Sequence, residues 1–280
     1  SEDRFTLSIS FHHAVLDGWS VALIIGQIRA AYEAGLAGGR TDTTGQERAP
    51  LPYSAYVLLE QQALAGREHS AFWASVVGGR SATRIAQGVP AGTETRPVSA
   101  DRVVPAEVAA ALRTFADAHG VPVKSVYLTL HLHALARLTG RRDALTGAVV
   151  NGRPEVDGGE LTSGLFLNTV PFAGTAVETG WGDAVRETFT AEQRMLAHRR
   201  YPLSEILRET RQDGAGGDLF DTVFNFTDFH VLDPARGRDA APPEVTIAGA
   251  VYFEQTNFPF VVHVARDAFT RQMTLTVNHD

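Results

Sequence analysis

The segment His12-His13-Ala14-Val15-Leu16-Asp17-Gly18-Trp19-Ser20 joins two hydrophobic patterns and decides the local fold. After it, apolar side chains recur at helical spacing over residues 21–32, with Ser20 available as the N-terminal cap. Before it, apolar residues alternate with polar ones, as in a half-buried strand: Phe5, Leu7, Ile9 and Phe11. The segment therefore predicts a strand, a polar turn and a helix.

Strand parity gives the two histidines different directions. If the alternation continues to residue 13, His13 lies on the side of the apolar residues and faces inward, whereas His12 lies on the other side. An inward imidazole at a strand end can act as a general base or hold a nucleophile, because its pKa lies near neutrality. The alternative is a hydrogen-bonded core histidine, which is the commoner fate of a lone buried histidine.

The remaining pattern predicts a mixed α/β sheet covered by helices. Helices are expected at 53–65, 69–77, 105–120, 123–138, 182–197 and 203–210. Strands are expected at 144–150, 165–172, 221–229, 245–253, 258–264 and 273–277. The helix at 123–138 is apolar nearly all round, so we expect it to be buried. Strands and helices interleave irregularly, which favours a mixed sheet over a doubly wound one.

Length, charge and composition exclude several classes of protein. The 280 residues are 44% hydrophobic and 20% charged, which excludes a disordered or collagen-like chain. A net charge of −7 without long tracts of one sign argues against nucleic acid or an anionic membrane as the main partner. No apolar run is long enough to span a membrane. The absence of cysteine excludes disulfides and thiolate chemistry and permits a cytoplasmic location.

Several ordered motifs resemble those of condensation domains of nonribosomal peptide synthetases, in the chloramphenicol acetyltransferase-like superfamily. Residues 12–20 match the family's HHxxxDG motif in its DGWS form. Residues 138–154, which end in Asn-Gly-Arg-Pro, look like the family's helix-then-strand segment. Residues 164–172 are similar to its GxFxNTxP motif, and residues 198–203 to its later HxxxP-type motif. The motifs span most of the chain in the family's order, so the resemblance is specific.

The resemblance implies two acetyltransferase-like lobes in a V-shaped pseudo-dimer with a tunnel between them. Residues 1–95 would be the remainder of the N-terminal lobe, which is incomplete here, and residues 96–280 the C-terminal lobe. The chain starts just before the double histidine, almost at once in a strand pattern, so we expect a fragment of a longer polypeptide.

The resemblance also implies a reaction and its partners. Donor and acceptor peptidyl carrier proteins would present substrates tethered by phosphopantetheine, and the acceptor amine would attack the donor thioester to form an amide. Neighbouring synthetase domains are further expected partners, as in antibiotic and other secondary metabolism. No cofactor is expected to bind the domain itself.

Residue by residue, the resemblance makes His13 the catalytic histidine and gives supporting roles to His12, Asp17, Gly18 and Arg153. Asp17 is expected to pair with Arg153, because an unpaired buried charge is costly; a surface cation is the alternative for Arg153. No metal site is expected at Asp17, since no further ligands converge on it. The residues that could line the tunnel, or else simply pack in the core, are Trp19, Asn168 and Asn225.

Three other functions share this superfamily. An epimerisation domain also carries the double histidine, although its motif usually departs from DGWS. A coenzyme A-dependent acyltransferase shares HHxxxDG but lacks the later motifs found here. A non-catalytic domain that binds carrier proteins or recruits an oxygenase usually loses the double histidine, which this chain keeps. We therefore expect a condensation domain.

Overall fold

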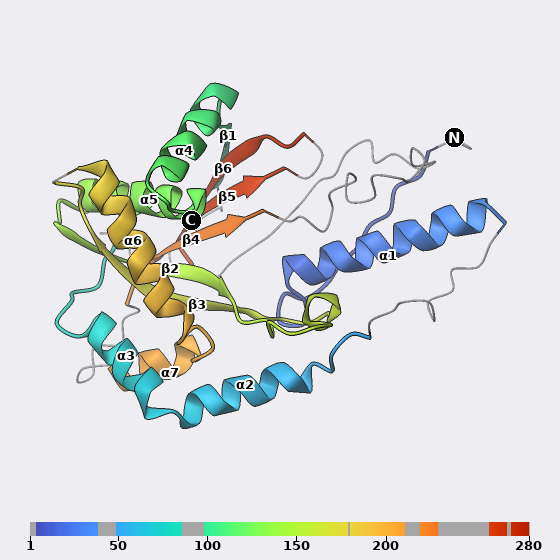
Figure 1. Cartoon of the computed structure of the whole chain (residues 1–280), viewed down its shortest axis with the longest axis horizontal. Coiled ribbons are helices and arrows are strands. Elements are labelled where there is room, and N and C mark those ends of the chain that lie inside the picture. The colour runs from blue at the N-terminus through green and yellow to red at the C-terminus, as the bar shows by residue number, and fades with distance from the viewer. Residues whose placement is uncertain are drawn as a thin grey trace. The chain divides into compact units, whose positions relative to one another are not determined.

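The computed structural model of the chain (Figure 1) describes residues 4–38, 49–85, 98–178, 180–210, 219–228, 258–267 and 270–279. These residues form two compact units. Unit 1 holds residues 4–38, 49–56 and 153–167, and unit 2 holds the described residues at 57–152 and from 168 onward. The boundary predicted between residues 95 and 96 falls outside the described residues and stays a prediction.

Unit 1 is built around α1, Gly18–Leu36, which confirms the helix predicted after the double histidine. The predicted cap is wrong: Asp17, not Ser20, is the N-cap, and its carboxylate accepts a 2.8 Å hydrogen bond from Ser20 N. A side-chain oxygen at the N-cap satisfies one of the free N–H groups of the first turn. The loop at 153–167 adds one turn of 3-10 helix, Gly159–Leu161.

Residues 4–12 form no strand, contrary to the prediction from their alternating pattern. Their apolar side chains are between 38% and 65% exposed. Alternation specifies which face of a strand can be buried, but a strand forms only when a neighbour supplies its hydrogen bonds. None of the described strands pairs with this segment. Strand parity therefore does not direct His13 inward, and both His12 and His13 are exposed.

The described residues of unit 2 form a six-stranded mixed sheet in the order β1-β6-β5-β4-β2-β3. β4 runs parallel to β2 and β5, whereas β6 runs antiparallel to β5 and β1. The strands are β1 Val98–Val103, β2 Asp143–Asn151, β3 Leu167–Thr175, β4 Thr222–Thr227, β5 Phe260–Arg266 and β6 Met273–His279. This confirms the predicted mixed sheet. The strand predicted at 245–253 lies outside the described residues, and β1 was not predicted.

The remaining helices confirm the helical periods of the sequence. They are α2 Ser54–Ala65, α3 Arg67–Val77, α4 Ala106–Ala118, α5 Val123–Thr139, α6 Trp181–Leu196 and α7 Leu203–Thr210. α5 packs on β2 and β4 and is flanked by α4 and α6 (Figure 1). Leu128, Leu132 and Leu135 of α5 are each 1% exposed, so the helix is buried as predicted. The main core lies between α5 and the sheet.

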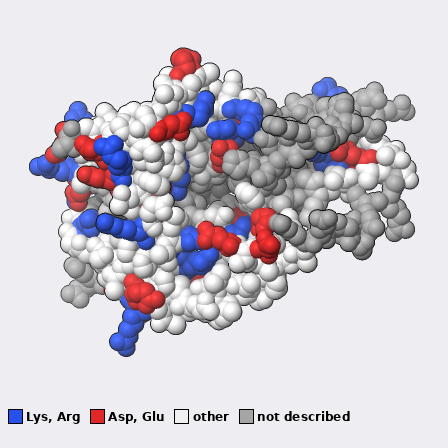
Figure 2. All heavy atoms as spheres, viewed as in Figure 1, with Lys and Arg blue, Asp and Glu red and all other residues white. Residues whose placement is uncertain are grey.

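The surface carries charges of both signs. On the face seen in Figure 2, acidic and basic side chains are interspersed and do not gather into one field. Within the part of the chain that the structure describes, no helix is both long enough and apolar enough to cross a membrane.

Candidate functional site

The double histidine lies in a short turn that leads into α1. Val15 N donates a 2.9 Å hydrogen bond to His12 O, and Ala14 N donates a 3.1 Å hydrogen bond to His12 Nδ1. The Nδ1 atom of His12 is therefore an acceptor and carries no proton in this arrangement. His13 is exposed, and its ring meets Phe11 edge-on with centroids 6.1 Å apart. The inward orientation predicted for His13 is wrong, because the segment before it is not a strand.

Asp17 is the buried centre of this region, at 1% exposure. Its Oδ2 accepts hydrogen bonds from Arg153 Nη2 at 3.2 Å and from Phe166 N at 3.3 Å. Its Oδ1 accepts from Ser20 N at 2.8 Å and lies 2.6 Å from Ser20 Oγ. The predicted contact between Asp17 and Arg153 is therefore confirmed. Each carboxylate oxygen has donors, so the buried negative charge is balanced.

Arg153 connects Asp17 to the loop at 153–167. Its Nη1 donates to Gly159 O at 3.1 Å and also to Thr162 O, and its guanidinium lies 3.9 Å from the centroid of the Phe166 ring. Burial lowers the pKa of Arg153 from its ordinary value, and the neighbouring Asp17 opposes that shift. Arginine keeps its proton in proteins, so this group is a fixed structural cation. At 7% exposure, Arg153 is not the surface cation of the alternative reading.

Gly164 joins the same loop to the start of α1. Gly164 O accepts a 3.0 Å hydrogen bond from Asp17 N, and Gly164 N donates a 3.0 Å hydrogen bond to Ser20 Oγ. A Cβ at Gly164 would lie 2.4 Å from the Tyr53 ring, so glycine is required for this close approach. Gly18 follows Asp17 as the first residue of α1. The turn that carries the histidines is thus held from its C-terminal side.

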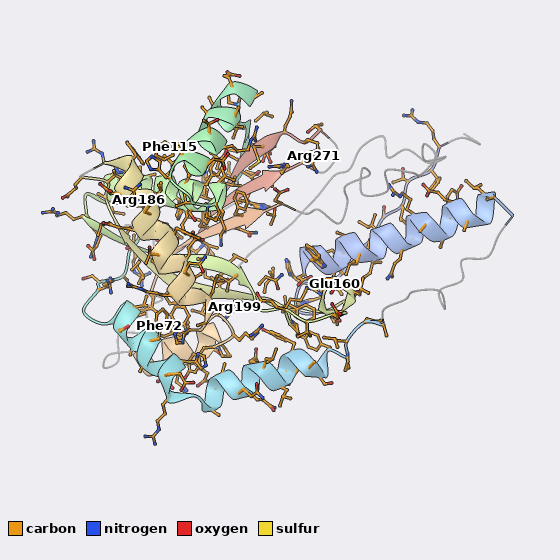
Figure 3. All side chains as sticks on the ribbon, in the orientation of Figure 1. Phe72, Phe115, Glu160, Arg186, Arg199 and Arg271 are labelled. Atoms are coloured by element: carbon orange, nitrogen blue, oxygen red, sulfur yellow. The ribbon has the colours of Figure 1, made fainter. Side chains whose placement is uncertain are left out.

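Two of the three residues that could line a tunnel, or else pack in the core, make hydrogen bonds within the described structure. Trp19 Nε1 donates a 3.0 Å hydrogen bond to Glu160 O, in the loop marked by Glu160 in Figure 3. The side-chain amide of Asn168, in unit 2, donates to two backbone carbonyls at 2.8 and 2.9 Å. Asn225 is half-buried on β4 of unit 2. Tunnel lining by these three residues stays a prediction.

A histidine pair in unit 2 was missed by the sequence reasoning. His69 Nδ1 lies 2.8 Å from His198 Nδ1, and Phe72 stacks on His198 with ring centroids 4.0 Å apart. One Nδ1 must donate and the other accept, so the two facing nitrogens share one proton. Burial, and then the neighbouring His69, lower the pKa of His198. The HxxxP-type motif drew attention to His198, but only the fold brings His69 to it.

The histidine turn can support proton transfer. An exposed imidazole on a turn braced by a buried ion pair can accept a proton from an attacking group or donate a hydrogen bond to an oxyanion. Among the residues that the structure describes, no group of three or more His, Asp or Glu side chains could hold a metal ion.

Sequence comparisons identify relatives of the chain. A family model described as Condensation domain matches residues 1–280. AMB antimetabolite synthetase AmbE of Pseudomonas aeruginosa is 36% identical over 84% of this chain and 11% of its own length. Surfactin synthase subunit 2 of Bacillus subtilis is 29% identical over 92% of this chain and 7% of its own length. The chain therefore spans only a small part of these relatives.

Solved structures share the fold. The first condensation domain of the calcium-dependent antibiotic synthetase matches with a TM-score of 0.72 at 19% identity, over 96% of this chain and 59% of that chain. The X-domain from teicoplanin biosynthesis matches with a TM-score of 0.71 at 18% identity, over 96% of this chain and 62% of that chain. These likenesses confirm the predicted fold class.

Proposed function

This chain belongs to the condensation-domain family, and we propose that it joins a donor acyl or peptidyl thioester to an acceptor amine during nonribosomal peptide synthesis. In this proposal, phosphopantetheine arms of a donor and an acceptor carrier protein deliver both substrates. The domain itself binds no cofactor, since the thioester arrives already activated. Neighbouring synthetase domains in the cytoplasm would load those carriers.

The observation that carries the proposal is the exposed His13 on a turn braced through Asp17 and Arg153. Attack by the acceptor amine forms a C–N bond at the thioester carbonyl, and the amine must lose a proton. Collapse of the tetrahedral intermediate breaks the C–S bond, and the departing pantetheine thiolate takes up a proton. We assign to His13 the acceptance of the first proton and its return to the leaving sulfur. No electron is gained or lost overall, so the step needs no redox partner.

The other motif residues support His13 in this proposal without touching the substrate. Asp17 and Arg153 form the buried pair that fixes the end of the turn. His12 accepts the Ala14 N–H and so shapes the turn itself. Gly18 begins α1 directly after the N-cap Asp17. Small displacements of a reacting group are costly in rate, which is why such bracing serves catalysis.

The test is to mix the full-length protein with a donor carrier and an acceptor carrier, each loaded with its aminoacyl group. Intact-protein mass spectrometry of the acceptor carrier should show a mass gain equal to the donor acyl group. In the control, the donor thioester is replaced by a stable amide analogue, and the mass gain should then be lost. Efficient transfer from acyl-coenzyme A without a carrier would favour the acyltransferase alternative. Carrier binding without transfer would favour a recruiting domain.

A further inference from the structure

The turn at residues 198–203, which we call the clamp turn, follows α6 in unit 2 and ends at Leu203, the first residue of α7. Arg199 Nε donates a 2.9 Å hydrogen bond to Asn151 O, and Arg200 Nε donates a 2.8 Å hydrogen bond to Gly152 O. Figure 3 marks Arg199 beside the end of α6. The two carbonyls belong to the last two residues before the loop at 153–167. The clamp turn therefore fixes the point at which the chain enters that loop.

The same turn fixes the point at which the chain leaves the loop. Asn168 is the first residue after it, and its Nδ2 donates hydrogen bonds to Arg199 O at 2.9 Å and Tyr201 O at 2.8 Å. Its Oδ1 accepts from Leu203 N at 3.4 Å. The side-chain amide of Asn168 thus both donates to and accepts from the clamp turn. The residues at both ends of the loop are therefore hydrogen-bonded to the same turn.

The clamp turn is itself firmly held. Arg199 is 7% exposed, and its Nη1 donates to Leu196 O at 2.7 Å. Tyr201 is 2% exposed and donates a 2.8 Å hydrogen bond to Glu209 Oε1. Burial raises the pKa of Tyr201 to about 12, so its hydroxyl keeps the proton that it donates. Buried, hydrogen-bonded polar networks of this kind are rigid.

We propose that the clamp turn positions the histidine turn for catalysis by fixing both ends of the loop at 153–167. That loop supplies the Arg153, Gly164 and Phe166 groups that bind Asp17 or Ser20, which follow His13 by four and seven residues in the chain. Fixing the ends of a loop removes conformations that it could otherwise adopt. Arg199 and Asn168 are then positioning residues, and their role in rate rests on the function proposed above.

The sharpest variant is Asn168→Asp, which keeps the size and the acceptor oxygen but removes both donated hydrogen bonds. It also places a carboxylate against two carbonyl oxygens. In hydrogen-exchange mass spectrometry of the full-length protein, amide exchange in peptides covering residues 153–167 and 15–21 should rise about tenfold or more. Arg200→Gln, which removes the contact with Gly152 O and leaves Asn168 in place, should give a smaller rise in the same peptides. It also provides the test if Asn168→Asp does not fold.

The matched control is Thr129→Val, which breaks a buried 2.9 Å contact between Thr129 Oγ1 and Thr188 Oγ1 in the interface of α5 and α6. It weakens unit 2 away from the clamp turn, so its extra exchange should stay within α5 and α6. Unchanged exchange at 153–167 in both clamp variants would overturn the proposal. The proposal would also be overturned if Thr129→Val raised amide exchange at residues 153–167 as much as the clamp variants do.

Catalysis gives the second measurement. In single turnover, Asn168→Asp should slow acyl transfer about 100-fold without weakening carrier binding, as expected when a reacting group is displaced by about 1 Å. Thr129→Val should leave the rate within about twofold of the natural protein. If the natural protein transfers no acyl group, the proposed function is wrong. The hydrogen-exchange measurements still test whether the clamp turn holds the loop at 153–167. If the natural protein transfers the acyl group and Asn168→Asp transfers it at the same rate, only the positioning role is contradicted.

Discussion

Among the single substitutions considered at the residue scale, Asp17→Ala has the largest expected effect on stability. Asp17→Ala removes one partner of a buried ion pair and leaves Arg153 without its carboxylate. We expect a loss of about 3 to 5 kcal/mol in the free energy of unfolding, measured by urea denaturation. Part of the loss comes from the N-cap that Asp17 supplies to α1.

The matched comparison is the exposed pair of Arg186 and Asp183, whose side chains are 51% and 61% exposed. Asp183→Ala removes a similar contact in water, and we expect it to cost about 0 to 1 kcal/mol. Equal losses for Asp17→Ala and Asp183→Ala would show that the buried pair does not brace the histidine turn.

His131 makes stability depend on pH. Its ring is buried in α5 with Nε2 3.0 Å from Thr146 Oγ1, and burial lowers its pKa from 6.5 to about 4. Below pH 6.5 the unfolded chain takes up a proton that the folded chain refuses until about pH 4. The free energy of unfolding should therefore fall by roughly 3 kcal/mol as pH drops through this window. His131→Gln should remove that part of the slope in urea titrations at pH 7, 5.5 and 4.5.

Contacts between residues were predicted correctly where both partners belong to family motifs. Predictions failed where a side chain's direction or contact depends on the three-dimensional fold. Asp17 and Arg153 stand at fixed places in two motifs, so their pairing could be expected. The direction of His13 depended on a strand that the described residues do not form. The pair of His69 and His198 joins positions 129 residues apart, and no local pattern announces such a contact.

At the scale of elements, two glycines should respond in opposite ways to the same substitution. A Cβ at Gly147 on β2 would lie 2.5 Å from Phe220 and 2.8 Å from Thr169, so Gly147→Ala overpacks the sheet. We expect a loss of about 1 to 3 kcal/mol. A Cβ at Gly26 in α1 meets nothing within 4 Å. Gly26→Ala should therefore stabilise by about 1 kcal/mol through helix propensity.

Thermal unfolding followed by circular dichroism measures both glycine variants. The melting temperature should fall for Gly147→Ala and rise for Gly26→Ala. An unchanged melting temperature for Gly147→Ala would mean that β2 can shift against its neighbours, contrary to the packing described for unit 2.

Helices were predicted better than strands, for a physical reason. A helix satisfies its hydrogen bonds locally, so apolar spacing and end signals such as Gly140 after α5 largely specify it. A strand depends on its neighbour. All six residues of β1 are exposed, so no apolar period marks them, yet they pair with β6. Residues 5–11 show the reverse case, a strand pattern without a described partner.

At the scale of the whole molecule, family motifs predicted the fold more reliably than periodicity did. Their order along the chain indicated the condensation-domain fold, which the solved structures share. The loop at 153–167 shows what the motifs could not express. Gly152 and Asn168, which flank the loop, belong to unit 2 and contact the clamp turn, whereas the loop itself belongs to unit 1 and contacts Asp17.

The central claim is that His13 carries proton transfer in amide formation, and single-turnover acyl transfer by the His13→Ala protein tests it most directly. The acceptor carrier is weighed by intact mass spectrometry after mixing with both loaded carriers. We predict a rate loss of about 100-fold or more with an unchanged melting temperature, because His13 is exposed. His12→Ala, which removes the acceptor for Ala14 N, should lower stability more than rate. Transfer by His13→Ala at the natural rate would contradict the account.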